Sequence, residues 1–327
     1  MAYIERRRVH DADAHIMEPP NWLRDHADPD IRDRLTVPQY ASELVQTGDA
    51  GAGESLAPDD LTAVFQRLAE RHRSEEFLAD EATDVMNRKN FAATGSFIAE
   101  DRPRVLDYIG VDSQLLFNTF HNSRLFEWEH PINGKPVDLD LAYGAARAHN
   151  RGMTEFCSVD ERLLATCYVP LADFDRAAAI AAESIEMGAA ALLVASGCPA
   201  GHSPSHRSLD RVWRQAEEAG IPVVFHVGGT GALIDPSYFN NGLPVPPDFH
   251  GGEENFRSVD YMAIPFPPMQ TLATMIFDGV LERHPNLRVG GIEQGCTWLP
   301  SWLKQMESAM DAFGRHEERL RDLSITP

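Results

Sequence analysis

The sequence predicts an α/β fold, a TIM-type (β/α) barrel with long insertions, from three observations. Short apolar, β-branched runs alternate with amphipathic stretches, which is the pattern of successive βα units. The apolar runs are continuous, as expected for parallel strands covered on both faces. No repeat of fixed length is present, so a solenoid is not favoured. The 327 residues suffice for one barrel or two smaller domains, and the regular alternation favours a single barrel domain over residues 1–327.

Six strands are expected along the chain. They span Val9–Ile16, Asp112–Asn118, Leu163–Pro170, Ala190–Ala195, Pro222–Val227 and Leu287–Ile292. Helices are expected within Leu139–Ser158, over Phe174–Met187 and Leu209–Ala219, and from Trp298 to about Ala312. Asp173 is placed to cap the second of these helices, and Gly220 to end the third. A full barrel needs eight strands, so the last two are missing from this sequence and are expected beyond Pro327.

Two long stretches interrupt this rhythm, at about residues 19–104 and 228–268. The first contains a Gly/Ala/Asp-rich loop over Thr47–Asp60. An amphipathic helix follows that loop, with four apolar residues on one face: Leu61, Val64, Phe65 and Leu68. The second stretch is rich in Gly, Pro, Asn and Phe. Long insertions in barrels often form lids or subunit contacts, so a homodimer is expected.

Composition excludes several classes of protein. The formal net charge of −21 disfavours binding to nucleic acid or to an anionic membrane surface. The four cysteines are scattered without a CxxC pair, which argues against a zinc ribbon or a disulfide framework. No apolar run approaches the roughly 20 residues needed to cross a bilayer, and no secretory signal is recognisable. A cytoplasmic protein acting on a small molecule is the expectation.

The strongest indication of chemistry lies on the first predicted strand, at Asp11, Asp13 and His15. Side chains of a strand alternate between its two faces, so these three are expected on the same face. Burying two carboxylates and an imidazole is costly unless something compensates, and a divalent metal ion is the natural compensation. Asp13 and His15 are therefore predicted to be metal ligands. For Asp11, a structural hydrogen bond is the favoured interpretation.

A second histidine lies at the end of the fifth predicted strand. His226 lies at the carboxyl end of this strand, shortly before Gly228-Gly229. Active sites of barrels lie at the carboxyl ends of the strands. We therefore predict that His226 is a metal ligand rather than a core histidine. Glu293 follows the sixth strand, where it could act as a catalytic base, hold a metal ligand, contact substrate or cap the helix near Trp298. These possibilities remain open. Cys296 is close in sequence but has no neighbouring histidine, so a catalytic thiol is not expected.

Several further residues are candidates for substrate binding. His121 follows the second strand and could line the barrel mouth, and Arg124 could clamp an anion. His202 and His206 follow the fourth strand and could bind a substrate carboxylate, while His250 lies in the second insertion. For each of these residues, an ordinary surface-loop role is the favoured interpretation and a substrate contact is the alternative.

Three segments give the chain a family resemblance. They are DADAHIMEPPNW near the start, HRSLDRVWRQAEEAGIPVVFHVG in the middle and FDGVLERHPNLRVGGIEQGCTWLPSWLKQM near the end. With these segments the chain resembles the amidohydrolase-2 family, in the branch of aminocarboxymuconate-semialdehyde decarboxylase and related aromatic-acid decarboxylases. The resemblance covers nearly the whole chain. Its motifs are specific for the family and much less so for the reaction.

The resemblance implies particular site residues. Asp13 and His15 would fill the first-strand ligand pair, written HxH or ExH in other members, and His226 would be the fifth-strand ligand. Glu293 stands where the decarboxylases place a catalytic histidine, which favours hydrolysis over decarboxylation. The fourth strand ends at Ser196 without the bridging lysine of binuclear members, which implies one metal ion. The family's last aspartate ligand, in an SDYPH-like motif, has no counterpart here. Asp311 and Asp322 are poor substitutes because both lie in helical patterns.

Together these features predict a mononuclear metal-dependent enzyme. One Zn²⁺ or Mn²⁺ ion at Asp13, His15 and His226 would activate water or orient a substrate carboxylate. The reaction would be hydrolysis or decarboxylation of a small, aromatic or unsaturated carboxylic-acid-type substrate, with Glu293 and His226 as catalytic residues. The alternative is a barrel that binds a ligand or partner without catalysis, because its metal site is incomplete.

Overall fold

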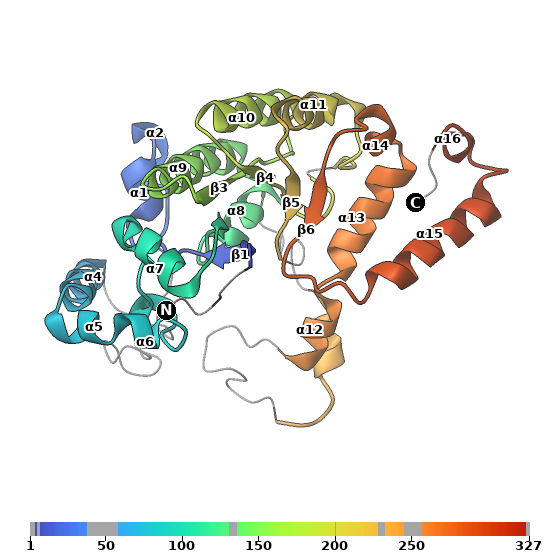
Figure 1. Ribbon diagram of the computed structural model, residues 1–327. Helices are drawn as coiled ribbons and strands as arrows, with labels where there is room; N and C mark the ends of the chain where they lie inside the picture. The colour runs from blue at the N-terminus through green and yellow to red at the C-terminus, as the bar shows by residue number, and fades with distance from the viewer. Residues whose placement is uncertain are drawn as a thin grey trace. The chain divides into compact units, whose positions relative to one another are not determined.

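Six strands form a parallel sheet in the computed structural model of the chain, in the order β1-β2-β3-β4-β5-β6 (Figure 1). The structure describes residues 4, 7–37, 58–130, 136–199, 201–227, 233–244 and 257–324. The strands are β1 (His10–His15), β2 (Ser113–Phe117), β3 (Leu163–Tyr168), β4 (Ala191–Leu193), β5 (Val223–Phe225) and β6 (Val289–Gly291). Each lies inside its predicted range, so the predicted α/β class is confirmed. The two strands expected beyond Pro327, and with them a closed barrel, stay predictions.

Helices connect the strands, as the alternating pattern predicts. Before β2 lie α1 (Trp22–His26), α2 (Pro29–Arg32), α4 (Pro58–His72), α5 (Glu75–Ala79), α6 (Glu81–Asp84) and α7 (Arg102–Ile109). Between β2 and β5 lie α8 (Asn122–Glu129), α9 (Leu139–Cys157), α10 (Phe174–Glu186) and α11 (Asp210–Ala219). After β5 come α12 (Ser258–Ala263), α13 (Phe266–Phe277), α14 (Val280–Arg283), α15 (Leu299–Phe313) and α16 (Glu318–Arg321). Short 3₁₀ turns cover Asn90–Ala92, Ala99–Asp101, Arg207–Leu209 and Pro236–Phe239.

By its internal contacts the chain divides into two units. Unit 1 comprises residues 1–124, 147–166 and 244–256, and unit 2 comprises residues 125–146, 167–243 and 257–327. A single barrel domain over the whole chain remains a prediction. No helix within the described part of the chain is both long and apolar enough to span a bilayer.

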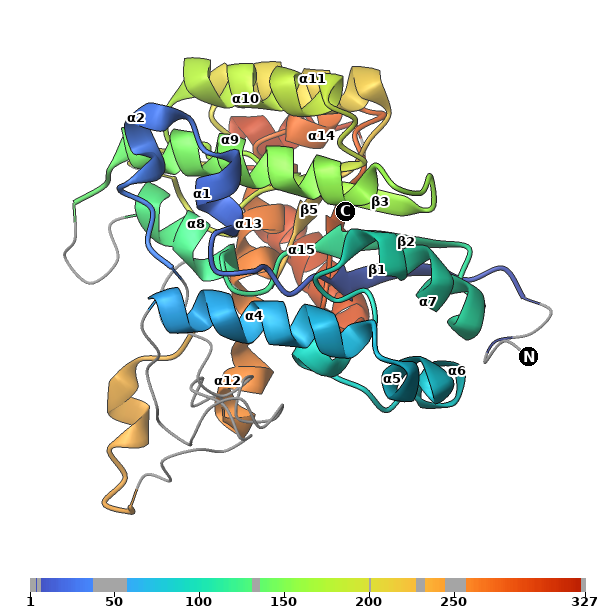
Figure 2. The same ribbon diagram turned by 90° about the vertical axis from the view of Figure 1, so that its left-hand side faces the viewer.

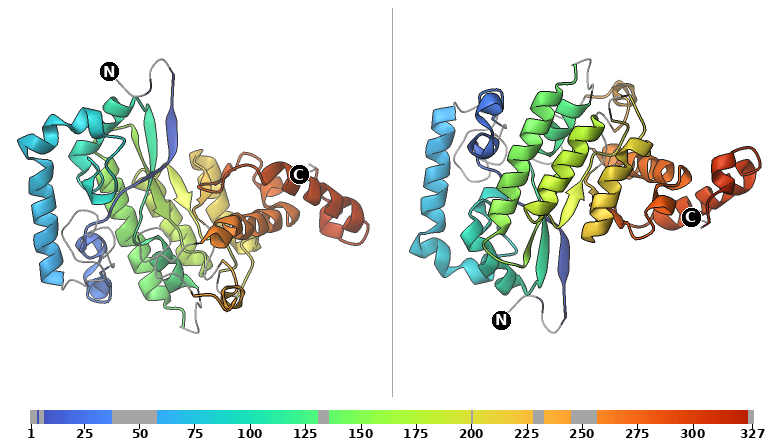
Figure 3. Two further views of the ribbon diagram at one scale, coloured as in Figure 1. Left: turned by 90° about the horizontal axis from the view of Figure 1, so that it is seen from below. Right: turned by 90° about the horizontal axis from the view of Figure 1, so that it is seen from above.

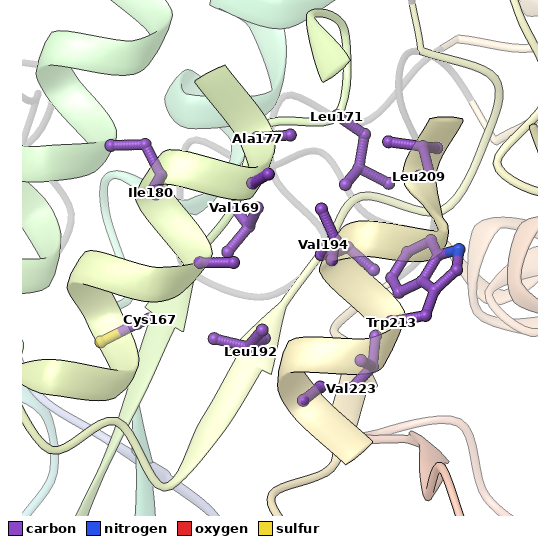
Figure 4. Close-up of a cluster of buried hydrophobic side chains, with 14 of the residues drawn as sticks. Cys167, Val169, Leu171, Ala177, Ile180, Leu192, Val194, Leu209, Trp213 and Val223 are labelled. Atoms are coloured by element: carbon purple, nitrogen blue, oxygen red, sulfur yellow. The ribbon is translucent and has the colours of Figure 1, made fainter. Parts of the chain in front are cut away.

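The core of unit 2 packs two helices against its strands. α10 and α11 lie side by side (Figures 1 and 3). Their buried side chains form one cluster with those of β4 and β5, in which Trp213, Leu192 and Val223 are fully buried (Figure 4). Asp173 accepts hydrogen bonds from two backbone N–H groups at the start of α10, so the predicted cap is confirmed. Gly220 ends α11 with a φ of 68°, a left-handed conformation that costs glycine little.

The first insertion contributes a separate core within unit 1. α4 runs into α5 and α6 (Figure 2) and buries the four apolar residues predicted for its inner face, Leu61, Val64, Phe65 and Leu68. They pack with Phe91, whose ring lies edge-on to that of Phe65 at 4.8 Å between centroids. The amphipathic pattern therefore predicted this helix correctly. Most of the Gly/Ala/Asp-rich loop before it, and His250 in the second insertion, lie outside the described residues.

Candidate metal centre

A bulge in β1 decides which side chains accompany His15. Asp11 pairs with Gln114 on β2, and His15 pairs with Phe117. These positions are four residues apart on β1 but three apart on β2, so β1 carries one extra residue. Because paired residues of parallel strands point the same way, Asp11 and His15 leave opposite faces of the sheet. The expectation that Asp11 shares a face with His15 was wrong. Asp11 instead accepts a hydrogen bond from Gln114 Nε2 at 3.0 Å, which confirms its structural role.

Asp13 and His15 form the first pair of candidate ligands. His15 Nε2 lies 3.4 Å from Asp13 Oδ1, and the two side chains are 28% and 35% exposed. The other ring nitrogen, Nδ1, lies 3.1 Å from the carbonyl oxygen of Asn118 and 3.2 Å from Thr119 Oγ1. The Thr119 hydroxyl proton is already donated to the carbonyl of Ile16 at 2.8 Å. Both partners of Nδ1 must therefore accept, and the neutral His15 ring carries its proton on Nδ1.

This tautomer leaves two electron-pair donors facing each other. In the neutral ring, Nε2 of His15 offers a lone pair on the side where Asp13 Oδ1 lies 3.4 Å away. A histidine that donates one ring N–H to a backbone carbonyl and offers the other nitrogen is the arrangement of metal-binding histidines. The donor set of the first pair therefore fits a divalent cation.

His226 and Glu293 form the second pair, within unit 2. His226 follows β5 directly and is 3% exposed, and its Nε2 lies 3.4 Å from Glu293 Oε2. Glu293 follows β6 with its side chain 52% exposed, and its backbone adopts a φ of 57°. Left-handed geometry is uncommon for residues other than glycine and is often found at functional sites. No side-chain hydrogen bond caps α15, so Glu293 does not have the capping role that the sequence left open.

Glu18, which the sequence analysis did not single out, is hydrogen-bonded to the segment that holds His15. Its carboxylate is fully buried. It accepts hydrogen bonds from the backbone N–H groups of Thr119 (2.9 Å), Phe120 (3.1 Å) and His121 (3.1 Å), and from the ring of His121 (3.1 Å). The available signal was an acidic residue three positions after His15, between Met17 and Pro19. His121 is thus a buried partner of Glu18 rather than an exposed loop residue.

The remaining substrate-binding candidates, Arg124 and His202, make contacts with other residues of the chain. Arg124 donates to Thr36 Oγ1 at 3.3 Å. His202 donates from Nδ1 to the carbonyl of Ser203 at 3.0 Å, and its ring packs on Phe174 with 4.6 Å between centroids. Their roles, and that of His121, toward a substrate stay predictions.

A buried carboxyl group in unit 2 has a perturbed proton affinity. Glu129, at the end of α8, is 1% exposed and accepts hydrogen bonds from Tyr168 Oη at 2.5 Å and from the backbone N–H of Leu171. Burial raises the pKa of Glu129 to about 7, against the lowering effect of these hydrogen bonds. Proton uptake at this carboxyl therefore falls in the neutral pH range.

Solved structures share this fold at low sequence identity. An amidohydrolase from Mycobacterium avium subsp. paratuberculosis is 21% identical with a TM-score of 0.62, over 98% of this chain and 82% of that one. 5-Carboxyvanillate decarboxylase from Novosphingobium aromaticivorans, solved with manganese, is 17% identical with a TM-score of 0.56, over 98% and 75%. 2,6-Dihydroxybenzoate decarboxylase from Rhizobium is 14% identical with a TM-score of 0.50, over 92% and 71%.

Sequence comparison gives the family. No curated protein sequence matches this chain. The family described as amidohydrolase matches residues 135–324, which is more than half of the 327 residues. The chain therefore belongs to the amidohydrolase family.

Proposed function

We propose that the chain is a divalent-metal-dependent decarboxylase of a small aromatic or unsaturated carboxylic acid. The observation that carries the proposal is the 3.4 Å approach of His15 Nε2 to Asp13 Oδ1, with the other ring nitrogen of His15 held by Asn118 and Thr119. His226 is proposed as the third ligand. His15 ends β1 and His226 follows β5, and parallel strands present their carboxyl ends at one edge of a sheet. Mixed nitrogen and oxygen ligands suit Zn²⁺ or Mn²⁺.

Each ligand has a defined task in this proposal. Asp13, His15 and His226 would hold the cation. Such an ion, when bound, supplies positive charge that polarises a carboxylate or carbonyl oxygen. His15 presents Nε2 because its Nδ1 proton is held by Asn118 and Thr119.

Glu293 is proposed to move the proton. As the bond between the ring carbon and the carboxyl carbon breaks, CO₂ leaves and the electron pair stays on the ring carbon. That carbon takes up a proton in exchange for CO₂, giving the C–H product. Glu293, whose side chain is 52% exposed, is proposed to relay this proton from solvent. The fold-level neighbours that decarboxylate 5-carboxyvanillate and 2,6-dihydroxybenzoate support this substrate class.

Hydrolysis is the second candidate, and Glu293 itself favours it. A carboxylate 3.4 Å from His226 Nε2 can accept a proton from attacking water and pass it to the leaving group of an ester, lactone or amide. A binding protein without catalysis is the remaining alternative from a different functional class.

One assay separates these functions. Protein loaded with Mn²⁺ or Zn²⁺ should release CO₂ from a hydroxybenzoate panel and leave aryl esters and lactones intact. Glu293→Gln should keep the metal and lower kcat about a hundredfold or more, because positioned proton transfer contributes roughly 10²–10⁴-fold. Glu307→Gln, at an exposed position of α15 paired with Lys304, serves as the matched control and should retain full activity. Turnover of esters without CO₂ release would favour hydrolysis. Protein that binds no metal after metal-replete expression, and turns over none of these substrates, would favour the binding role.

A further inference from the structure

The buried carboxylate of Glu18 connects the end of β1 to the segment after β2. Three successive backbone N–H groups, of Thr119, Phe120 and His121, converge on its two oxygens at 2.9–3.1 Å. The imidazole of His121 adds a fourth hydrogen bond at 3.1 Å. A fully buried carboxylate is costly unless hydrogen-bond donors surround it. The backbone of residues 119–121 must therefore keep the conformation that points these N–H groups at Glu18. Burial alone would raise the pKa of Glu18, but the interactions with His121 and the backbone hydrogen bonds together lower it.

The same segment holds the ring of His15. Thr119 donates its backbone N–H to Glu18 and accepts His15 Nδ1–H at its hydroxyl. The carbonyl of the preceding residue, Asn118, is the other acceptor for that proton. Glu18 therefore fixes the backbone that supplies both acceptors. Thr119 thus links the carboxylate of Glu18 to the ring of His15.

We propose that Glu18 is a positioning residue that sets the tautomer and orientation of His15 for metal binding by way of Thr119. The inference rests on the proposed function, because it assigns His15 a metal to bind. The same carboxylate fixes His121: Nδ1 of His121 donates to Glu18, so its Nε2 is the nitrogen left to face other groups. One buried glutamate would thus order two imidazoles after neighbouring strands.

Metal titration of Glu18→Gln tests this inference. The amide keeps one acceptor oxygen but places N–H donors against backbone N–H groups, so the segment after β2 should lose its order. We expect the affinity for Mn²⁺ or Zn²⁺, measured by competition with a chromophoric chelator, to fall about 10–100-fold, as for other residues that hold metal ligands. Glu81→Gln is the matched control. Glu81 is also a buried carboxylate of unit 1, but it pairs with Arg104, and its replacement should leave metal affinity unchanged.

A second variant tests the route through Thr119 even if Glu18→Gln folds poorly. Thr119→Val removes the hydroxyl acceptor but keeps the backbone N–H that Glu18 binds, and it should also weaken metal binding. Thr119→Ser keeps a hydroxyl group and should bind the metal as tightly as the wild type. Imidazole ¹⁵N spectra of the metal-free protein should show His15 protonated on Nδ1 in the wild type and a mixture of tautomers in Thr119→Val. Unchanged metal affinity in both Glu18→Gln and Thr119→Val would overturn the positioning role alone. A wild-type chain that binds no metal would overturn the proposed function and this inference together.

Discussion

His226→Ala is expected to lose the bound metal and all turnover while keeping the fold. Removing residues that only orient a metal ligand already costs about 10–100-fold in metal affinity. Loss of the ligand itself should therefore cost more than about a hundredfold. Metal content after dialysis should fall from about one equivalent to a small fraction, measured by elemental analysis. His15→Ala should lose the same single equivalent, because both rings are proposed to bind one ion.

The matched control is another buried histidine of the same unit. His130 is 4% exposed, close to the 3% of His226, and its Nδ1 donates to the carbonyl of Phe126. His130→Ala should lower the free energy of unfolding but retain the metal. Retention of metal and activity in His226→Ala would exclude His226 as a ligand. Loss of metal in His130→Ala as well would show that general destabilisation, and not loss of a ligand, releases the ion.

Glu129→Gln is expected to change how stability depends on pH. The pKa of Glu129 is raised by burial from the ordinary 4.5 to about 7. Between these values the folded chain holds a proton that the unfolded chain has released, so the free energy of unfolding falls as pH rises. Each pKa unit is worth about 1.4 kcal/mol, which gives a loss of roughly 3 kcal/mol by pH 8. Glutamine has no such proton, so the variant should gain roughly 3 kcal/mol relative to wild type between pH 4.5 and pH 8.

Denaturant unfolding at a series of pH values measures this difference. Glu81→Gln supplies a comparison in which the free energy of unfolding depends on pH in the opposite direction. Burial would raise the pKa of Glu81, but its hydrogen bonds and ion pair with Arg104 lower it. Wild type therefore gains stability from Glu81 above its unfolded pKa and loses it as pH falls through the folded value. A pH-independent difference between Glu129→Gln and wild type would show that this carboxyl group keeps an ordinary pKa in the folded protein.

The sequence predicted the strands because their pattern is local. A run such as Leu163–Pro170 is apolar or aromatic at every position except Thr166, and β3 forms within it, over Leu163–Tyr168. The later strands are the shortest, with β4, β5 and β6 at three residues each. Asp13 with His15 was also predictable, because residues two apart on a strand are near neighbours.

Features that depend on distant pairing were not predictable in the same way. The bulge that turns Asp11 away from His15 arises from the register of β1 on β2, whose paired residues Asp11 and Gln114 are 103 positions apart. The contact of Glu18 with His121 spans the same separation. Strict alternation assumes that no residue is inserted, and a single sequence does not show where a partner strand requires an insertion.

We propose that Asp13, His15 and His226 bind one cation. Anomalous diffraction from crystals of Mn²⁺- or Zn²⁺-loaded protein tests it most directly. We expect one peak, with both imidazoles and the Asp13 carboxylate at about 2.0–2.3 Å from it. Two separate peaks, one at each pair, or a single peak that lacks either imidazole, would contradict the claim.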